Sequence, residues 1–415
     1  MSSVKIKPSQ IKIGYFIELP VSWMKHPFLT SKFKVASQDQ IAVIQTLELE
    51  FVYLYPEKST ILAAPPQEEQ SSQTVDEVKD QLEQEKQQRI EQAKEQRRQI
   101  QRTEKAFRQS MAKVRAIMTL ISSRPLQAIE DGTELINDLA DTILNADALV
   151  LHLISQAGKE QENIYYHVLN VSTLAMMLGK NLGLSAEQVK LIGIGALFHD
   201  IGKSKIPSPI LRKTEPLTTP ELNLFKLHTR YGVELLKLTE TFPEQALPIV
   251  GQHHEFLDGS GYPEGLKGVA INTLARVVTV VNEFDNLCHP PNQKDARSPH
   301  QAMSILFKGM QGKLGQAEVE QLIKMMGVYP PGTLVRLSDE RIGLVMSVNS
   351  KKLLYPNVVA YDAEIPRLEA PILSLEEGKL SISEVLKPSD LPPEVYEYLN
   401  PRAKISYFIQ DEERR

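Results

Sequence analysis

The residues best suited to chemistry form two histidine motifs that are well separated in the chain. His199-Asp200 ends the apolar stretch that begins at Ile194, and His253-His254 follows further on. An imidazole and a carboxylate are costly to bury in apolar surroundings unless each has a partner, and a divalent cation is a partner for both. The sequence therefore predicts a metal site to which both motifs contribute.

The histidines as a group strengthen this prediction, because five of the nine fall in one region with helical periodicity. A single histidine on an apolar helix is usually a hydrogen-bonded core residue, but five beside an aspartate are hard to explain by packing. Imidazole and carboxylate ligands suit iron, manganese or zinc, and the lack of thiolates argues against a structural zinc site. Two metals that share Asp200 would account for so many ligands. The five are His167, His199, His228, His253 and His254.

The region that must position these histidines, residues 126–326, is predicted to be all α. Apolar residues recur at helical spacing from Val168 to Leu182, and Gly183 ends that helix. Ser185 and Gln188 form a capping box for the next helix, which leads into the His-Asp pair. We therefore expect a mainly α protein with an all-helical core that holds the site.

A small strand-rich domain is predicted for residues 1–65. Apolar residues alternate with a period of two from Ile11 to Ile17 and again from Leu47 to Leu54. The aromatic segment from Trp23 to Phe28 lies between them. It either completes the core of this small domain or lines a pocket for a ligand or partner, and the sequence leaves both open.

Residues 66–125 are predicted to be a linker followed by a long helix. The linker is rich in Pro, Gln and Ser, whereas Val75 to Ser122 contains neither Pro nor Gly. Up to residue 92 we expect a solvated polar helix. Over residues 93–121 a heptad spacing favours a coiled coil or a docked bundle helix, and the coiled coil would make a homodimer. The heptad residues are Ala93, Ile100, Phe107, Val114 and Ile121.

A small β appendage with a tail is predicted for residues 327–415. Thr333–Leu337, Gly343–Val348 and Val358–Tyr361 read as three short strands after a turn. The tail beyond Asp362 is too polar to assign to an element.

The composition is that of a globular protein with more than one domain. The chain has 415 residues, 42% hydrophobic and 24% charged, and a formal net charge of −5 that attracts neither nucleic acid nor membrane. Its one cysteine, Cys288, excludes an intramolecular disulfide. Neither a signal core nor the ~20 consecutive apolar residues of a membrane helix occur. We expect a cytoplasmic protein that binds neither nucleic acid nor membrane.

The ordered motifs resemble the HD-GYP signature of the HD metal-phosphohydrolase superfamily, over about residues 160–290. His-Asp alone is a weak signal, but an ordered set that ends in Gly-Tyr-Pro is specific. Residues 1–65 are similar to the uncharacterised domain that often precedes HD-GYP modules in bacteria. The matching motifs are His167, His199-Asp200-Ile201-Gly202-Lys203, His228, His253-His254-Glu255 and Asp258-Gly259-Ser260-Gly261-Tyr262-Pro263.

This resemblance implies hydrolysis of the 3′-5′ phosphodiester of cyclic di-GMP to pGpG, and in some members on to GMP. Two divalent ions, iron or manganese, would lower the pKa of a water between them and neutralise charge on the phosphate oxygens. Lys203 would face the scissile phosphate. The implied ligands are His167, His199 and Asp200 for one ion, and Asp200, His228, His253 and His254 for the other.

The chain departs from the family pattern at the end of the metal set and in the basic segment after it. Where the family has Asp, this chain has Asn282, a weaker ligand without charge, and Asp285 is a further candidate ligand. The segment in which the family holds the nucleotide phosphates keeps only Lys294. Asn163, at a position where members with a third metal carry Glu, favours two metals.

Three functions follow from these observations. The first is a cyclic di-GMP phosphodiesterase with Asp200 and Lys203 as catalytic residues. The second is a catalytically weak or inactive module that binds cyclic di-GMP or a protein partner, which Asn282 favours. The third is a metal phosphohydrolase for another nucleotide. Substrate contacts are expected from Lys203, Lys294 and the loop Gly261-Tyr262-Pro263, which is also the candidate site for a signalling partner.

Overall fold

The computed structural model contains two compact units, Met1–Arg97 and Arg98–Arg415, each described by itself. No helix in the described part of the chain has both the length and the hydropathy needed to cross a membrane. The described residues are 3–21, 25–28, 31–60, 74–145, 149–156, 163–290, 292, 295–349, 353–363, 365, 370, 372–376, 380–387, 390–399 and 404–411.

The first unit is a small antiparallel sheet with one short helix, as the strand-rich prediction requires. The strands are shorter than expected, because the chain turns at Gly14 (φ 91°) and β2 begins only at Phe16. Helix α1 (Gln38–Gln45), capped by Ser37, was not predicted. Trp23 lies outside the described residues. In sheet order the strands are β1 (Val4–Ile6), β4 (Val52–Leu54), β2 (Phe16–Glu18) and β3 (Lys32–Lys34).

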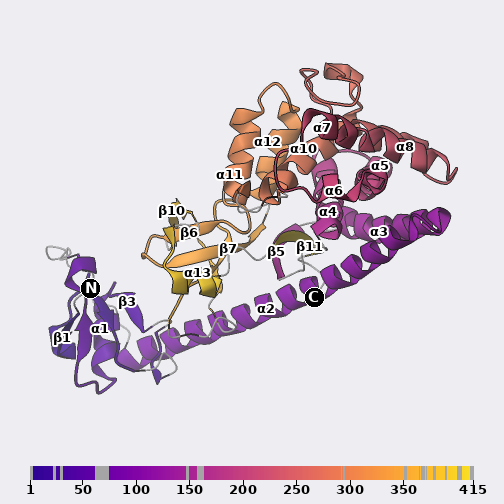
Figure 1. Cartoon of the computed structure of the whole chain (residues 1–415). Helices are drawn as coiled ribbons and strands as arrows, with labels where there is room; N and C mark the ends of the chain where they lie inside the picture. The colour runs from indigo at the N-terminus through magenta and orange to yellow at the C-terminus, as the bar shows by residue number, and fades with distance from the viewer. Residues whose placement is uncertain are drawn as a thin grey trace. The chain divides into compact units, whose positions relative to one another are not determined.

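Helix α2 (Val75–Leu120) is one uninterrupted helix that begins in the first unit and ends in the second (Figure 1). Near its start Val78 packs against the apolar core of the first unit. Phe107 and Val114, with no exposed side-chain surface, belong to the core of the second unit. Of the two alternatives, the structure supports a docked bundle helix for this half. The side chains of the earlier heptad residues lie outside the description, and a homodimer stays a prediction.

The helical core of the second unit is built around three buried helices, α4, α5 and α10. Ser185 and Gln188 make the predicted capping box at the start of α5, and Gly183 (φ 76°) follows the end of α4. The mainly α prediction is confirmed. The helices are α3 (Pro125–Asn145), α4 (Asn163–Asn181), α5 (Ala186–Phe198), α6 (Ser208–Leu211), α7 (Thr219–Lys226), α8 (His228–Lys237), α9 (Leu247–Gln252), α10 (Thr273–Cys288), α11 (Pro299–Ser304) and α12 (Gln316–Met326), with the 3-10 turn η5 (Ile201–Lys205) after α5.

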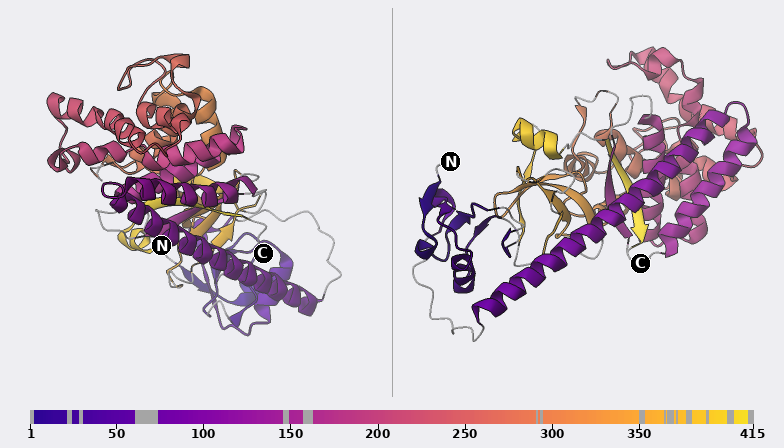
Figure 2. Two further views of the ribbon diagram at one scale, coloured as in Figure 1. Left: turned by 90° about the vertical axis from the view of Figure 1, so that its right-hand side faces the viewer. Right: turned by 90° about the horizontal axis from the view of Figure 1, so that it is seen from below.

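An antiparallel sheet completes the second unit (Figures 1 and 2). Strands β6 (Leu334–Leu337), β7 (Ile342–Asn349) and β8 (Asn357–Ala360) are the three that the sequence predicts. The unassigned tail adds β9 (Ile372–Ser374), β10 (Ile382–Leu386), α13 (Pro393–Leu399) and β11 (Lys404–Asp411).

One strand of this sheet corrects the all-helical expectation for residues 126–326. β5 (Leu149–Gln156) leaves the helical region between α3 and α4 and pairs with β11 along its whole length and with β7 on its other side. Its partner strands, at residues 342–349 and 404–411, come much later in the chain. Local periodicity therefore could not reveal the pairing. The sheet is thereby tied to the start of α4, against which β11 also lies.

Candidate metal site

The His-Asp pair stands at the end of a helix that is apolar and buried for most of its length. α5 ends at Phe198, His199 follows with helical dihedrals, and Asp200 turns the chain into η5. At Gly202 a Cβ atom would lie 1.9 Å from the carbonyl oxygen of His228. Only glycine therefore lets η5 approach α8 closely enough to bring His228 beside Asp200.

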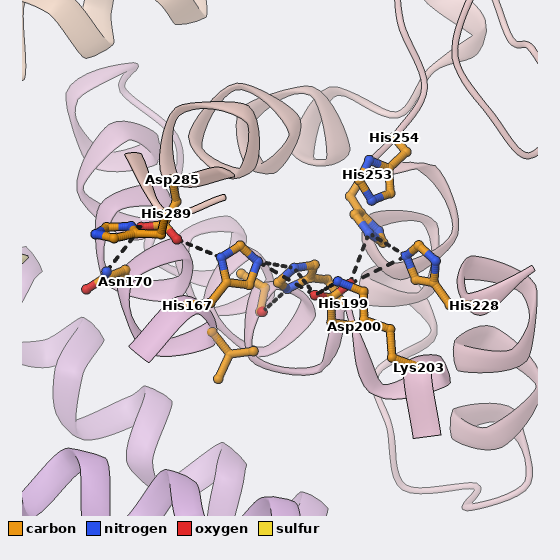
Figure 3. Close-up of polar contacts among 12 residues, drawn as sticks. His167, Asn170, His199, Asp200, Lys203, His228, His253, His254, Asp285 and His289 are labelled. Carbon is orange, nitrogen blue, oxygen red and sulfur yellow. Dashed lines mark hydrogen bonds and ion pairs between the residues drawn. The ribbon is translucent and has the colours of Figure 1, made fainter. Parts of the chain in front are cut away.

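Asp200 lies between two groups of imidazole nitrogens, one facing each carboxylate oxygen (Figure 3). Its Oδ2 is 3.4 Å from His199 Nε2 and 3.6 Å from His167 Nε2, and we call these residues the Oδ2 group. Its Oδ1 is 3.4 Å from His228 Nε2 and 3.8 Å from His253 Nε2. These two residues and His254 form the Oδ1 group. In each group, Asp200 included, the donor atoms lie within 4.8 Å of one another.

The tautomers of three of these histidines follow from their partners. Nδ1 of His199 lies 2.6 Å from the carbonyl oxygen of Ala196, and His228 and His253 make the same contact within their own segments, at 2.7 and 2.9 Å. A carbonyl oxygen only accepts, so each Nδ1 donates a proton to it. In a neutral ring the lone pair is then on Nε2, directed at Asp200.

These inward lone pairs fit a divalent cation. Nε2 of His228 is 3.4 Å from Nε2 of His253, too close for two unshared lone pairs without a proton or cation between them. Burial lowers the pKa of His228 to about 4 and also lowers that of His253 and of His254, so protons do not fill this role at neutral pH. Asp200 Oδ1 is buried without a hydrogen-bond partner. Neutral imidazoles around a buried carboxylate oxygen that has no hydrogen-bond donor are a ligand set suited to iron or manganese.

Asp200 is held in its ionised form. Burial by itself would raise its pKa, but Lys203, which pairs with Oδ2, and the surrounding histidines outweigh it and hold the pKa well below its usual range. The Lys203 ammonium also lies 5.4 Å from the ring centroid of Phe225. The predicted catalytic pair is therefore in direct contact.

Asp285, predicted as a metal ligand, stands behind His167 and outside both groups. Its Oδ2 accepts a hydrogen bond from His167 Nδ1 at 2.7 Å. Its Oδ1 accepts from Asn170 Nδ2 and from His289 Nδ1, both at 3.1 Å. Sequence reasoning assigned neither Asn170 nor His289 to the site. Their helical spacing, three after His167 and four after Asp285, was the available signal.

Two neighbours on α10 are the uncharged ligand candidate Asn282 and the carboxylate of Glu283. Asn282 is buried, and its side-chain nitrogen has no hydrogen-bond partner. Glu283, which was not predicted, lies beside the other group, with Oε1 3.9 Å from His254 Nδ1. Burial raises the pKa of Glu283 to about 7, against the opposing charge of Lys313.

The Gly-Tyr-Pro loop folds back onto the tandem histidines. The ring of Tyr262 stacks on His254, with centroids 4.6 Å apart and planes 20° apart, and its peptide bond to Pro263 is cis. A Cβ on Gly261 would lie 2.4 Å from the His254 carbonyl oxygen, so this approach requires glycine. Binding of a signalling partner to this loop stays a prediction.

The buried carboxylate of Glu255 holds the far side of that loop. It accepts hydrogen bonds from the backbone N–H groups of Glu264, Gly265 and Leu266, at 2.7, 3.1 and 2.9 Å. Lys294, the predicted phosphate contact, lies outside the described residues. A cation that was not predicted, Lys226 of α7, lies 5.3 Å from the ring centroid of Tyr262. The loop therefore forms one wall of the site, with a lysine beside it.

Comparison with known proteins adds family relationships. Residues 3–131 match the domain of unknown function DUF3391, and residues 126–316 match the HD domain. The chain is 26% identical over 386 residues to the cyclic di-GMP phosphodiesterase PA4108 of Pseudomonas aeruginosa, covering 90% of this chain and 89% of that one.

Two further relatives match only part of their own length. The cyclic di-GMP phosphodiesterase response regulator RpfG of Xanthomonas campestris pv. campestris is 38% identical over 164 residues, which is 37% of this chain and 43% of the relative. The 3′3′-cGAMP-specific phosphodiesterase 1 of Vibrio cholerae is 34% identical over 145 residues, which is 34% of this chain and 33% of the relative. This chain thus spans less than half of either relative.

Proposed function

Because this chain is an HD-GYP protein that joins a DUF3391 domain to an HD domain, we propose that it is a metal-dependent cyclic di-GMP phosphodiesterase. One observation carries the proposal: the two oxygens of Asp200 face two sets of imidazole nitrogens, one set on each oxygen. Similarity to a cyclic di-GMP phosphodiesterase over 90% of the chain supports the substrate.

The donor atoms suggest how two metal ions would be held. His167, His199 and Asp200 would hold one ion, and Asp200, His228, His253 and His254 the other. Such ions activate water as a nucleophile and neutralise charge on a phosphodiester. The lowered pKa values of His228, His253 and His254 and the ionised state of Asp200 prepare the Oδ1 group for a cation without a further proton transfer.

The remaining side chains would bind and orient the substrate. The Lys203 ammonium is partly exposed, at 21% of its side-chain surface, and is held at the site by its pairing with Asp200. An ammonium in this place can turn to a phosphate oxygen as a point charge. Lys226, over the Tyr262 ring, offers a second cation in a chain whose segment after α10 keeps only Lys294 of the family's basic residues. Cleavage of one phosphodiester would release pGpG, and a second cleavage would give GMP.

The proposal is tested with purified full-length chain, loaded with Fe²⁺ under anaerobic conditions or with Mn²⁺, and incubated with cyclic di-GMP. We expect pGpG, with or without GMP, when the products are separated by chromatography. Asp200→Ala should give none, and Asp141→Ala, a matched change at an exposed position of α3, should behave as the parent chain. Absence of product with either metal would contradict the proposal.

Two other experimental results would assign a different function to the chain. Saturable binding of cyclic di-GMP without turnover would assign the chain as a binding module, consistent with the uncharged Asn282. Turnover of 3′3′-cGAMP with cyclic di-GMP untouched would assign the third function, which the similarity to a cGAMP-specific phosphodiesterase favours. Both substrates should therefore be assayed on the same metal-loaded sample.

A further inference from the structure

The carboxylate of Asp285, which orients His167, also accepts hydrogen bonds from two further side chains. Asp285 has no exposed side-chain surface, and its two oxygens accept from three side chains: His167, Asn170 and His289 (Figure 3). A carboxylate only accepts, so His167 and His289 each donate from Nδ1. His167 therefore keeps its lone pair on Nε2, directed at the site.

His167 differs in this respect from the other described histidines of known tautomer. His199, His228 and His253 donate to main-chain carbonyls, whose positions are set by their own helices. His167 depends on a side-chain carboxylate, whose orientation depends in turn on Asn170 and His289. A carboxylate that loses one of its donors can rotate, and the imidazole that it orients can follow.

The backbone holds His289 in place for this contact. His289 is the first residue after α10, and its N–H donates to the main-chain oxygen of Asp285 at 2.8 Å. Eight residues later, the N–H of Arg297 donates to the carbonyl oxygen of Leu287, in the last turn of α10. Asp285 thus receives two hydrogen bonds from one residue, one on its backbone and one on its carboxylate. The Nδ1 donor is present whether the ring is neutral or cationic.

We propose that His289 is a positioning residue for the metal ion held by His167, acting through Asp285. The proposal rests on the metal site of the proposed function and adds a member to it from outside the recognised motifs. Outer hydrogen-bond partners of ligand histidines typically change metal affinity by about 10–100-fold when they are lost. Loss of the His289 donor should therefore weaken one of the two ions and leave the other unchanged.

The test compares His289→Leu, which removes the donor, with His289→Asn, whose side-chain nitrogen can reach the Nδ1 position. His300→Leu on α11 is the control for a histidine-to-leucine change. Mn²⁺ affinity is measured by calorimetry without substrate, and bound metal is counted by mass spectrometry. We expect one of two ions to bind about 10–100-fold more weakly to His289→Leu, with recovery in His289→Asn and no change in the control.

Equal Mn²⁺ affinities for His289→Leu and the parent chain would overturn the proposal, as would equal weakening of both ions or failure of His289→Asn to recover. If leucine prevents folding, as judged by circular dichroism of the metal-free protein, His289→Ala removes the same donor. The readout is independent of catalysis. A parent chain that binds two ions but does not cleave cyclic di-GMP would refute the proposed function alone, and one that binds no ion would refute both.

Discussion

The two sides of Asp200 differ in that one histidine of the Oδ2 group, His167, is oriented by a side chain. In the Oδ1 group, His228 and His253 are oriented by carbonyl oxygens of their own segments, three residues before them. In the Oδ2 group, His167 is oriented by Asp285, a side chain from another helix that needs partners of its own. A main-chain acceptor survives most substitutions, whereas a side-chain network can be lost one member at a time. The Oδ2 side should therefore be the more easily weakened.

Charge is also divided unequally between the two sides. The family resemblance assigns position 282 to the ion of the Oδ2 group, where Asn282 brings no charge in place of an aspartate. Its buried side-chain nitrogen has no hydrogen-bond partner. Glu283, one residue on, lies beside His254 of the Oδ1 group instead. A dication attracts nearby carboxylates strongly in a low-dielectric site. We therefore expect the ion of the Oδ2 group to be the weaker of the two, and five substitutions test this comparison.

The largest effect is expected from Asp200→Ala, which removes the ligand that both sides share. Bound metal should fall from two ions to none, and turnover of cyclic di-GMP should drop by more than about 10³-fold, because metal activation and charge stabilisation disappear together. Metal analysis and the product assay on one sample check this. A variant that keeps one ion would show that the two sides are independent.

His253→Gln and His167→Gln test metal binding by the Oδ1 group and the Oδ2 group separately. Each should cost one ion, and each should reduce activity by more than the about 10–100-fold typical of an outer partner. The ion that remains in His253→Gln should be the weaker one, and the ion that remains in His167→Gln the stronger. Mn²⁺ titration of both variants gives the two affinities. The reverse order of the two affinities would contradict the prediction that the Oδ2 group holds its ion more weakly.

Asn282→Asp should strengthen the weaker side. A carboxylate near a dication contributes more than about 1.4 kcal/mol even at an effective dielectric constant of about 20, so Mn²⁺ affinity should rise at least about tenfold. Asn181→Asp, exposed at the end of α4, is the control. Unchanged affinity and rate in Asn282→Asp would show that charge does not limit the Oδ2 side.

Glu255→Gln should have the smallest effect and act on the loop beside the Oδ1 group. It weakens the acceptor of hydrogen bonds from three backbone N–H groups, so the free energy of unfolding should fall by about 1–2 kcal/mol. Metal content should be unchanged, and the KM for cyclic di-GMP should rise. Glu264→Gln changes an exposed side chain of the same loop and is the control. Loss of a metal ion in Glu255→Gln would instead show that the loop orients His254.

Much of the fold could be predicted because its signals are local. Helical spacing, the capping box at Ser185 and the glycine after α4 lie within a few residues of the elements that they define. Strand β5 could not be predicted in this way, because it is defined by pairing with β7 and β11 from the far end of the chain. The short helix α1 was missed because it lies between the two alternating segments, in a stretch for which no element was predicted.

For the site, the sequence by itself determined which residues could bind metal, because imidazole and carboxylate chemistry and the order of the motifs are properties of the chain. The family resemblance also implied two ligand sets, but only the tertiary structure decided how their atoms face one another. It placed one Asp200 oxygen toward each group and moved Asp285 from ligand candidate to support. It also identified His289, which sequence reasoning did not assign to the site, as a further donor to Asp285. The physical reason is that a hydrogen bond depends on the direction of a lone pair, and direction exists only once α4, α5, η5, α8 and α10 have packed together.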